Sequence, residues 1–508
     1  MDGTPYASWM IADPNSQITR SKLMMKKTLV LASMAAVSAL LVVGIAGLGL
    51  DKSPAVHASR LAGIQGAGAS AIQVQNLDAS LDAQIVADFY NQKGSAAVTV
   101  NLPDVAAGSA ANIYLPGTQA LTNGAYAAII SADRQIAAIA RTDWSTSGGA
   151  AIYSNVIPGN EVSVPLAAKG YNGQTTLASI QNTDTGQQAT VTVEFYKAGS
   201  AAPLVSTQKN IGPGTSVTVD LGKDAAFSTV PAGTLGALVV KSASIPVGVQ
   251  AFMDIENFTK AVYAYEGVPS EQAAATLYAP LIRNDFFGTT GISVVNPGTT
   301  PVQVTVTYIA SPLTPACSGQ STHGGKSFQI DPKSSAVFYQ GNVAALPTGD
   351  SGLPAKCLGA AKIDATGGNI LAIVNDAELA KAGTSAAYNA FPAASGAKKV
   401  ALPLFRRRHT NQDLSTGIQV MNIGDSSANV SIAFKNSSGQ SPVVASGASQ
   451  TIAPLDSYTW FPPNLSGIPD GTYGSASLTS DQPIVAIVND ASSTGKVDAA
   501  IYSGIKAD

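Results

Sequence analysis

The sequence predicts an all-β protein of four tandem immunoglobulin-like β-sandwich domains that follow an N-terminal signal peptide or membrane anchor. Three observations lead to this prediction: segments that recur four times, apolar–polar alternation within them, and the absence of helical periodicity after residue 58. Alternation with a period of two and many β-branched residues is typical of half-buried antiparallel strands. Short strands of this kind, separated by Gly, Pro, Ser and Asn, are typical of β-sandwiches.

The N-terminal segment, 1–58, reads as an extension followed by a signal peptide. Lys26 and Lys27 precede an almost unbroken apolar run over 28–50, and Val56 and Ala58 place small residues at −3 and −1 of a cleavage after Ala58. The apolar run is also long enough to cross a bilayer core of ~30 Å, so an uncleaved single-pass anchor remains an alternative. In both cases the repeats lie outside the cytoplasm, in an extracellular or cell-surface location.

A short strand that ends in asparagine begins each repeated unit. The four asparagines recur at intervals of 106, 114 and 126 residues, and an aromatic residue follows each of them after 12 or 13 residues. These structural anchors are Asn76, Asn182, Asn296 and Asn422 with Phe89, Phe195, Tyr308 and Phe434. Because the asparagines lie in phase with the apolar face of their strand, we expect each side chain to bond loop backbone at the strand end.

A second recurring block is an apolar strand that ends in aspartate. Residues 484–490 read IVAIVND and residues 370–376 read ILAIVND, and the corresponding strands of the other units end at Asp143 and Asp254. We expect these aspartates to form Asx turns. Calcium at domain joints is a weaker alternative, because no D-x-D string accompanies them. Each unit closes with an Ala/Tyr strand around Tyr153, Tyr263, Tyr388 and Tyr502.

Proline motifs suggest where the domains meet. Val164-Pro165-Leu166, Ala279-Pro280-Leu281 and Leu402-Pro403-Leu404 recur, and proline commonly marks the edge or end of a strand. The predicted domains are therefore 59–166, 167–281, 282–404 and 405–508, of which the third is enlarged. Because long Gly/Ser linkers are absent, we expect the domains to stack end to end as a semi-rigid rod.

Cys317 and Cys357 are the only cysteines, and both lie in the enlarged third domain. In an oxidising compartment a structural disulfide is the expected arrangement, because no CxxC or His-paired spacing indicates a metal or catalytic thiol. A closed loop of this length contributes roughly 4 kcal/mol to stability in the chain-entropy model.

Few residues are candidates for binding. Arg406, Arg407 and Arg408 form the one concentrated charge. They could bond carboxylates or carbonyls of a neighbouring domain, or they could grip an anionic polymer or another protomer. Trp144, and Trp460 beside Phe461, stand in loop-like contexts, where aromatic rings can stack on sugars or pack beneath the loop.

Composition argues against several functional classes. Charged residues make up 12% of the chain and the net charge is −3, which gives no basic excess for nucleic acid. Three histidines leave little room for metal or acid–base chemistry, and no nucleophile elbow, zinc-binding helix or phosphate loop occurs. The sequence therefore predicts a protein that is not an enzyme and holds no cofactor.

The Asn strand, the aromatic anchor and the I-V-A-I-V-N-D strand give the chain a resemblance to uncharacterised bacterial secreted and surface proteins made of tandem immunoglobulin-like repeats. The resemblance implies a structural role, as a rod-like stalk or a subunit of a surface layer or fibre. An adhesin or carbohydrate-binding protein that uses loop aromatics is the alternative. The expected partners are further copies of the chain or a surface polysaccharide or protein, with membrane contact only through an uncleaved N-terminal segment.

Overall fold

The computed structural model describes residues 68–507, apart from 93, 95–96, 145–147, 256–261, 312–316, 318–321, 342–350, 379–383, 442–446 and 493–498. All of these residues belong to one compact unit, Lys52–Asp508. They form β-strands and a few short 3-10 helices, and the named strands pair antiparallel, which confirms the all-β prediction. None of the helices in this part of the chain has the length and apolar character needed to cross a membrane. The predicted signal peptide or anchor lies outside the described residues.

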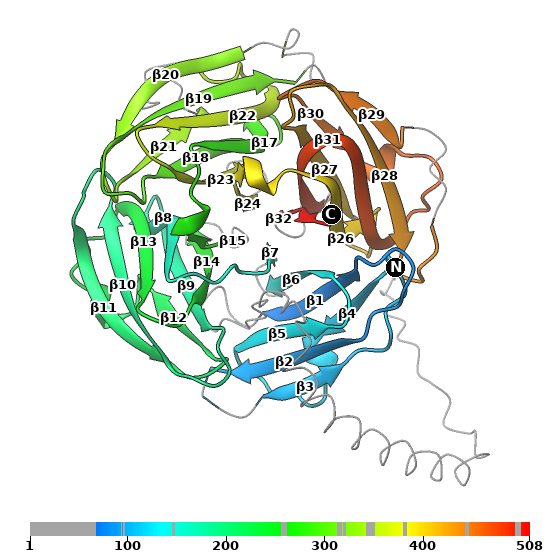
Figure 1. Cartoon of the computed structure of the whole chain (residues 1–508), viewed down its shortest axis with the longest axis horizontal. Coiled ribbons are helices and arrows are strands. Elements are labelled where there is room, and N and C mark those ends of the chain that lie inside the picture. The colour runs from blue at the N-terminus through cyan, green and yellow to red at the C-terminus, as the bar shows by residue number, and fades with distance from the viewer. Residues whose placement is uncertain are drawn as a thin grey trace, which may run out of the picture. The chain divides into compact units, whose positions relative to one another are not determined.

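Four sets of strands follow one another along the chain (Figure 1), and we refer to them as repeats 1 to 4. Repeat 1 comprises β1 (Ala69–Asn76), β2 (Ile85–Asn91), β3 (Val98–Asn101), β4 (Ala110–Tyr114), η1 (Leu115–Gly117), β5 (Tyr126–Ala132), β6 (Ile136–Trp144) and β7 (Gly149–Ser154). Repeat 2 comprises β8 (Glu161–Tyr171), β9 (Gln174–Asn182), β10 (Ala189–Lys197), β11 (Pro203–Ile211), β12 (Ser216–Asp220), η2 (Ala225–Phe227), β13 (Thr234–Ser242), β14 (Val247–Ile255), β15 (Val262–Glu266) and β16 (Val268–Pro269).

Repeats 3 and 4 each begin with a 3-10 helix. Repeat 3 comprises η3 (Ser270–Gln272), β17 (Thr276–Asn284), β18 (Thr289–Val295), β19 (Val302–Ala310), β20 (Thr322–Ile330), β21 (Ser335–Tyr339), β22 (Cys357–Thr366), β23 (Leu371–Glu378), β24 (Thr384–Asn389) and β25 (Phe391–Pro392). Repeat 4 comprises η5 (Ala393–Ser395), β26 (Ala397–Arg406), β27 (Leu414–Asn422), β28 (Ala428–Asn436), β29 (Ser449–Ile452), β30 (Ser457–Trp460), η6 (Pro462–Asn464), β31 (Tyr473–Ser492), β32 (Ala500–Ser503) and β33 (Ile505–Lys506).

Each repeat has two layers of strands, and repeat 3 shows them as separate sheets. One sheet has the order β20-β19-β22-β17-β25 and the other the order β21-β18-β23-β24. Apolar side chains of both sheets, such as Val304, Ile363, Ile292 and Val374, belong to one buried cluster. Repeat 1 has a three-stranded and a four-stranded sheet, whereas the layers of repeats 2 and 4 are joined into sheets of nine and eight strands. The arrangement is β-sandwich-like.

The proline motifs lie inside strands, which corrects their interpretation as joints. Pro165, Pro280 and Pro403 belong to β8, β17 and β26, and each of these strands pairs with a later strand of its own repeat. The register shifts at each proline, where a residue without an N–H interrupts the ladder least. The predicted boundaries after residues 166, 281 and 404 therefore fall within the first strand of a repeat.

The repeats close on one another instead of forming a rod. The last long strands β7, β15, β24 and β32, which we refer to as the inner strands, contact one another in that order, and β32 contacts β7 in turn. Figure 1 shows the inner strands facing a common centre. Repeat 4 thus packs against repeat 1, and the prediction of end-to-end stacking is wrong.

Shared apolar clusters explain this closure. The cluster of repeat 1 includes Phe252 of repeat 2, and the cluster of repeat 2 includes Ile373 of repeat 3. The cluster of repeat 3 includes Ile487 of repeat 4, and the cluster of repeat 4 includes Ile152 of repeat 1. Each repeat therefore buries apolar surface of the next one, and burial of such surface is the main driving force for association.

Candidate functional site

The four anchor asparagines make one shared set of hydrogen bonds. In repeat 1, Asn76 Nδ2 donates to the carbonyl oxygens of Leu81, at 2.8 Å, and Val105, at 2.9 Å, and its Oδ1 accepts from the Asp78 N–H at 2.9 Å. Asn182, Asn296 and Asn422 repeat the pattern, and all four side chains are fully buried. Each amide joins a strand end to two loops, so these asparagines hold the fold and do not face a ligand. The aromatic anchors Phe89, Phe195, Tyr308 and Phe434 are buried in the cores.

A tyrosine on the inner strand ties down the first strand of three repeats. The hydroxyls of Tyr388 and Tyr502 donate to the carbonyl oxygens of Leu281, at 2.7 Å, and Leu404, at 2.6 Å. Tyr265 bonds the carbonyl oxygen of Leu166 in the same way. Sequence reasoning assigned Tyr263 to this set, but Tyr263 donates instead to Gln174 Oε1 at 3.0 Å. In a strand, a shift of two residues keeps the same face, so the pattern did not distinguish the two tyrosines.

Three of the four recurring aspartates, Asp143, Asp376 and Asp490, pair with arginines, which corrects the expectation of Asx turns at these positions. They lie inside strands, and Asp376 accepts from Arg283 Nη1 at 2.7 Å. Asp490 accepts from Arg406 Nη1 and from Arg141 Nη1, both at 2.6 Å. Arg141 belongs to repeat 1, so Asp490 links the first and last repeats by a buried ion cluster. The guanidinium groups occupy the place that the calcium interpretation gave to a metal, and no metal-ligating cluster occurs among the described residues.

Each residue of the triple arginine contacts a carboxylate within the fold. Arg406 is paired with Asp490. Burial of Arg406 lowers the pKa of its guanidinium group, and the nearby Asp490 carboxylate opposes that shift. Arg407 Nε bonds Asp470 at 2.8 Å and also donates to two carbonyl oxygens, and Arg408 reaches Asp470 at 3.3 Å. The three arginines therefore make structural contacts, but their partners lie within repeat 4 and not in a neighbouring domain as expected.

Trp144 and Trp460 do not form a binding surface. Trp144 is 0% exposed and Trp460 is 1% exposed, and Trp460 Nε1 donates to the carbonyl oxygen of Gly447 at 2.7 Å. Phe461 is 40% exposed. Tyr114 and Tyr339 stand at the same position of repeats 1 and 3, just where β4 and β21 end, and are also exposed. Sequence reasoning missed these two tyrosines, although aligning the strands of the repeats would have shown them.

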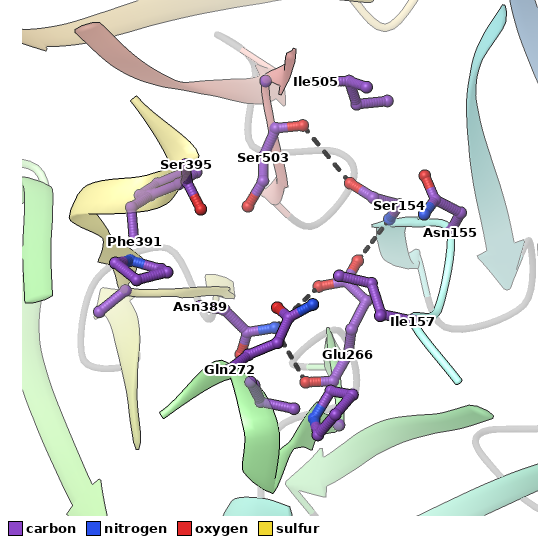
Figure 2. A pocket seen from close by; sticks show the side chains of 16 residues that line it. Ser154, Asn155, Ile157, Glu266, Gln272, Asn389, Phe391, Ser395, Ser503 and Ile505 are labelled. Carbon is purple, nitrogen blue, oxygen red and sulfur yellow. Dashed lines mark hydrogen bonds between the residues drawn. The ribbon is translucent and has the colours of Figure 1, made fainter. Parts of the chain in front are cut away.

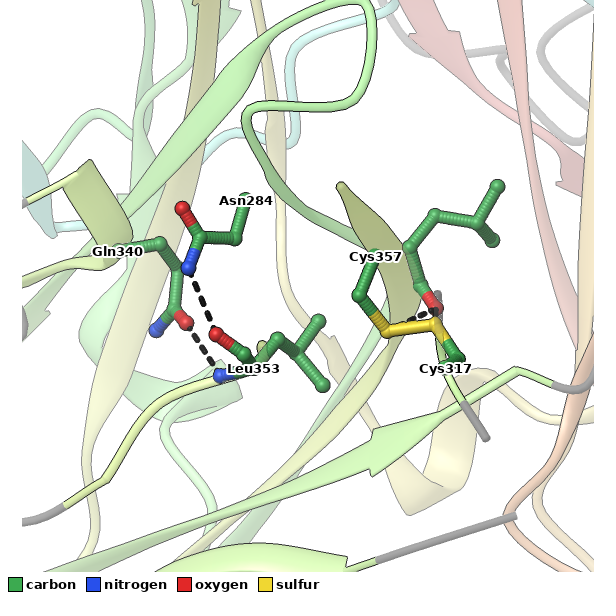
Figure 3. The surroundings of a disulfide bond; sticks show 6 residues. Asn284, Cys317, Gln340, Leu353 and Cys357 are labelled. Carbon is green, nitrogen blue, oxygen red and sulfur yellow. Dashed lines mark hydrogen bonds between the residues drawn. A yellow bond between two sulfur atoms is a disulfide. The ribbon is translucent and has the colours of Figure 1, made fainter. Parts of the chain in front are cut away.

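The disulfide is present as predicted (Figure 3). Cys317 and Cys357 are joined with a Cα–Cα distance of 5.3 Å, and both side chains are buried. Cys357 begins β22, so the bridge ties the enlarged loop to a core strand. Leu353 lies nearby, where its carbonyl accepts from Asn284 Nδ2 at 2.6 Å and its N–H donates to Gln340 Oε1 at 2.8 Å.

A pocket of about 210 Å³ lies where the inner strands end (Figure 2). It is the best candidate for a functional site, because each repeat contributes the residue that follows its inner-strand tyrosine. These residues are Ser154, Glu266, Asn389 and Ser503. The segments that follow the inner strands add apolar walls, including Ile157, Val268, Phe391 and Ile505.

Glu266 is the charged residue of this pocket. Its Oε1 accepts from the Ser154 N–H at 2.5 Å and its Oε2 from Asn389 Nδ2 at 3.3 Å, and Asn389 Nδ2 also donates to the Glu266 carbonyl at 2.9 Å. Desolvation raises the pKa of the Glu266 carboxyl, and the bond from Ser154 opposes this shift. Sequence reasoning missed this site, because a single glutamate after a repeated tyrosine carries no recognisable motif.

Comparison with known proteins gives limited information. Residues 288–507, most of repeats 3 and 4, match a model described as "Family of unknown function (DUF5719)". No curated protein matches the sequence. A mutant of the major pilin from Streptococcus pyogenes is 9% identical, with 68% of this chain and 99% of that chain covered and a TM-score of 0.13. A glycoside hydrolase of family 32 from Bifidobacterium adolescentis is 8% identical, with 86% and 99% covered and a TM-score of 0.14. Neither score carries an argument about function.

Proposed function

We propose that this chain is an exported, non-catalytic structural protein of the cell surface or extracellular space, in which four immunoglobulin-like β-sandwich domains close on one another. The observation that carries this proposal is the cyclic sharing of apolar clusters between consecutive repeats, including repeats 4 and 1. The recurring polar residues stabilise this arrangement through hydrogen bonds and ion pairs within the fold. Examples are Asn422, Asp490 and Arg406. The disulfide supports an oxidising compartment.

Further copies of the chain are the partners that this architecture favours. The strands β3, β11, β20 and β29 each end a sheet, and Figure 1 shows them on the outer side of their repeats. An end strand of nine residues such as β11 offers a row of backbone groups to a second strand. The low charge of the chain, 12% charged residues, reduces the cost of desolvation in such contacts. Edge-to-edge pairing would give a layer or fibre.

Electron microscopy with light scattering of the full chain, purified from an exporting host in mild detergent, tests this proposal. We expect ordered layers or fibres that form with rising concentration. The double variant Leu204→Asp with Gln208→Asp, on β11, should suppress assembly by placing charges on that edge. Ser431→Asp with Ala433→Asp, exposed on the interior strand β28, is the matched double control and should assemble normally. Particles that stay monomeric at every concentration would contradict a layer or fibre subunit.

Adhesion is a second candidate, for one specific reason. Tyr114, Tyr339 and Phe461 are exposed and occupy the same position in three repeats. Exposed aromatic side chains are common at recognition surfaces, where their rings bury large apolar area. A glycan and cell-wall binding screen with the triple alanine variant tests this function, and unchanged binding by the variant would exclude these residues.

A further inference from the structure

The pocket at the ends of the inner strands breaks the equivalence of the repeats. At one shared position, repeats 1, 3 and 4 carry a serine, an asparagine and a serine, whereas repeat 2 carries Glu266. The structural roles of the repeats do not need a charge here, since the three other repeats close without one. Glu266 therefore places one negative charge where all four repeats meet (Figure 2).

The described part of the chain provides Glu266 with no cationic partner. No lysine, arginine or histidine lines the pocket, and the carboxylate accepts hydrogen bonds from a backbone N–H and an amide, those of Ser154 and Asn389. Asn389 Oδ1 is itself buried and accepts no hydrogen bond from the described residues. The pocket thus has an excess of acceptor oxygens and of negative charge. A ligand that fits it must donate hydrogen bonds and carry a positive charge.

The walls distinguish an organic cation from a metal ion. Phe391, Ile505, Val268 and Ile157 give the pocket an apolar lining on more than one side. Calcium prefers six to eight oxygen ligands, and one carboxylate within such walls is a poor site for it. A volume of about 210 Å³ has room for roughly seven water molecules, and so for a small organic molecule.

We propose that this pocket binds a small organic ammonium compound, with Glu266 as the ion-pair partner, Asn389 Oδ1 as a second acceptor, and Phe391 and Ile505 as walls for the apolar part. An ammonium group has three donors and one charge, which match the acceptors present. An aromatic face near a cation adds further attraction. This inference goes beyond the proposed structural function and does not depend on assembly.

Isothermal titration calorimetry of the full chain with n-butylammonium chloride tests the proposal, with n-butanol as the neutral probe of similar shape. We expect saturable binding of n-butylammonium and no binding of n-butanol. Glu266→Gln should weaken binding about tenfold or more, because it removes the charge and leaves the shape. Glu271→Gln is the matched control, since Glu271 is exposed on the neighbouring η3 and does not line the pocket. It should bind as the wild type does.

A second variant separates loss of the site from loss of the fold. Asn389→Ala removes the second acceptor and should weaken binding about threefold to tenfold, the effect of one hydrogen bond. Thermal unfolding of each variant shows whether it is folded at the temperature of titration. Equal binding of n-butanol, undiminished binding by a folded Glu266→Gln variant, or the absence of any binding by the wild type would each overturn the proposal.

Discussion

Asp490 and Glu266 are two carboxylates that lie where the repeats meet, and they differ in burial and in the charge of their partners. Asp490 is fully buried and contacts two guanidinium groups, those of Arg406 and Arg141. Glu266 faces a pocket and bonds only uncharged donors. The first carboxylate therefore has more than enough positive charge within the fold, whereas the second has none among the described residues.

The difference indicates which charge serves the structure and which one is available for a ligand. Burial of an unpaired charge is costly, so a carboxylate that only supports the fold is paired, as Asp490 and Asp376 are. Glu266 lacks such a partner, and desolvation raises the pKa of its carboxyl. An unpaired charge that costs stability is common at sites that bind or react.

Replacement of Asp490 by alanine should have the largest effect. The variant leaves Arg141 and Arg406 buried without their common partner, so we expect the free energy of unfolding to fall by about 3–5 kcal/mol. Asp376→Ala is the matched variant in repeat 3, where Arg283 of the same repeat loses its carboxylate, and a smaller loss of about 1–3 kcal/mol is expected. Urea denaturation at neutral pH measures both losses. Equal losses would mean that the link to repeat 1 adds nothing.

Replacement of Arg141 by methionine removes the link from Asp490 to repeat 1, together with the ion pair of Arg141 with the half-exposed Asp143 of its own strand. Asp490 keeps Arg406, so we expect a loss of only about 1–2 kcal/mol. Hydrogen exchange should become faster in β7 and β32, which meet at this contact, and stay unchanged in β15 and β24. Lys333→Met, which removes the half-buried ion pair with Glu161 between repeats 3 and 2, is the control and should cost less than about 1 kcal/mol. Faster exchange in all four inner strands would mean that the effect is not confined to the contact between repeats 4 and 1.

Much of the local fold could be predicted from the sequence, because period-two alternation reports directly on which face of a strand is buried. Phe195 and Asn182 are buried at the positions that this pattern gave them. The closure of the repeats is a different matter. Strands such as β6 and β14 are buried on both faces, and their near-continuous apolar runs were a signal that a second layer covers them. That signal does not say which element covers the strand, so the packing of Ile152 in the cluster of repeat 4 could not be predicted.

Some residues of the candidate sites could likewise be predicted from the sequence, and others could not. A disulfide between two cysteines follows from elimination, and sequence reasoning found it. The pairing of Asp490 with Arg141 joins residues 349 positions apart, and no local pattern reports such a contact. Glu266 was visible only as a departure from serine and asparagine at one position of the repeat, which becomes meaningful once the tyrosines are aligned through the strand pairing.

Replacement of Glu266 by glutamine should have the opposite sign from the Asp490 variant. Glutamine keeps an oxygen that accepts the Ser154 N–H and removes a desolvated charge. We expect the free energy of unfolding at pH 8 to stay the same or to rise by up to about 1 kcal/mol. Thermal unfolding measures this change, with the exposed Glu271→Gln as a control that should have no effect. A clear loss of stability would mean that the Glu266 charge supports the fold as that of Asp490 does.

The pH dependence of the difference in stability between the wild type and Glu266→Gln is the smallest and most specific effect that we expect. The pKa of Glu266 is higher in the folded protein than in the unfolded chain, so the folded state holds its proton to higher pH. At a pH below the unfolded pKa the carboxyl is protonated in both states and contributes no difference. As the pH rises through the interval between the two pKa values, the unfolded state releases the proton first and the wild type loses stability relative to Glu266→Gln. The Tm of the variant minus that of the wild type should therefore grow as the pH rises above about 4.3, the usual pKa of a glutamate, and level off once the pH exceeds the folded pKa. A difference that shrinks as the pH rises would show that the Glu266 carboxylate stabilises the fold, and a constant difference would show that its pKa does not change on folding. Either result would remove the contrast with Asp490.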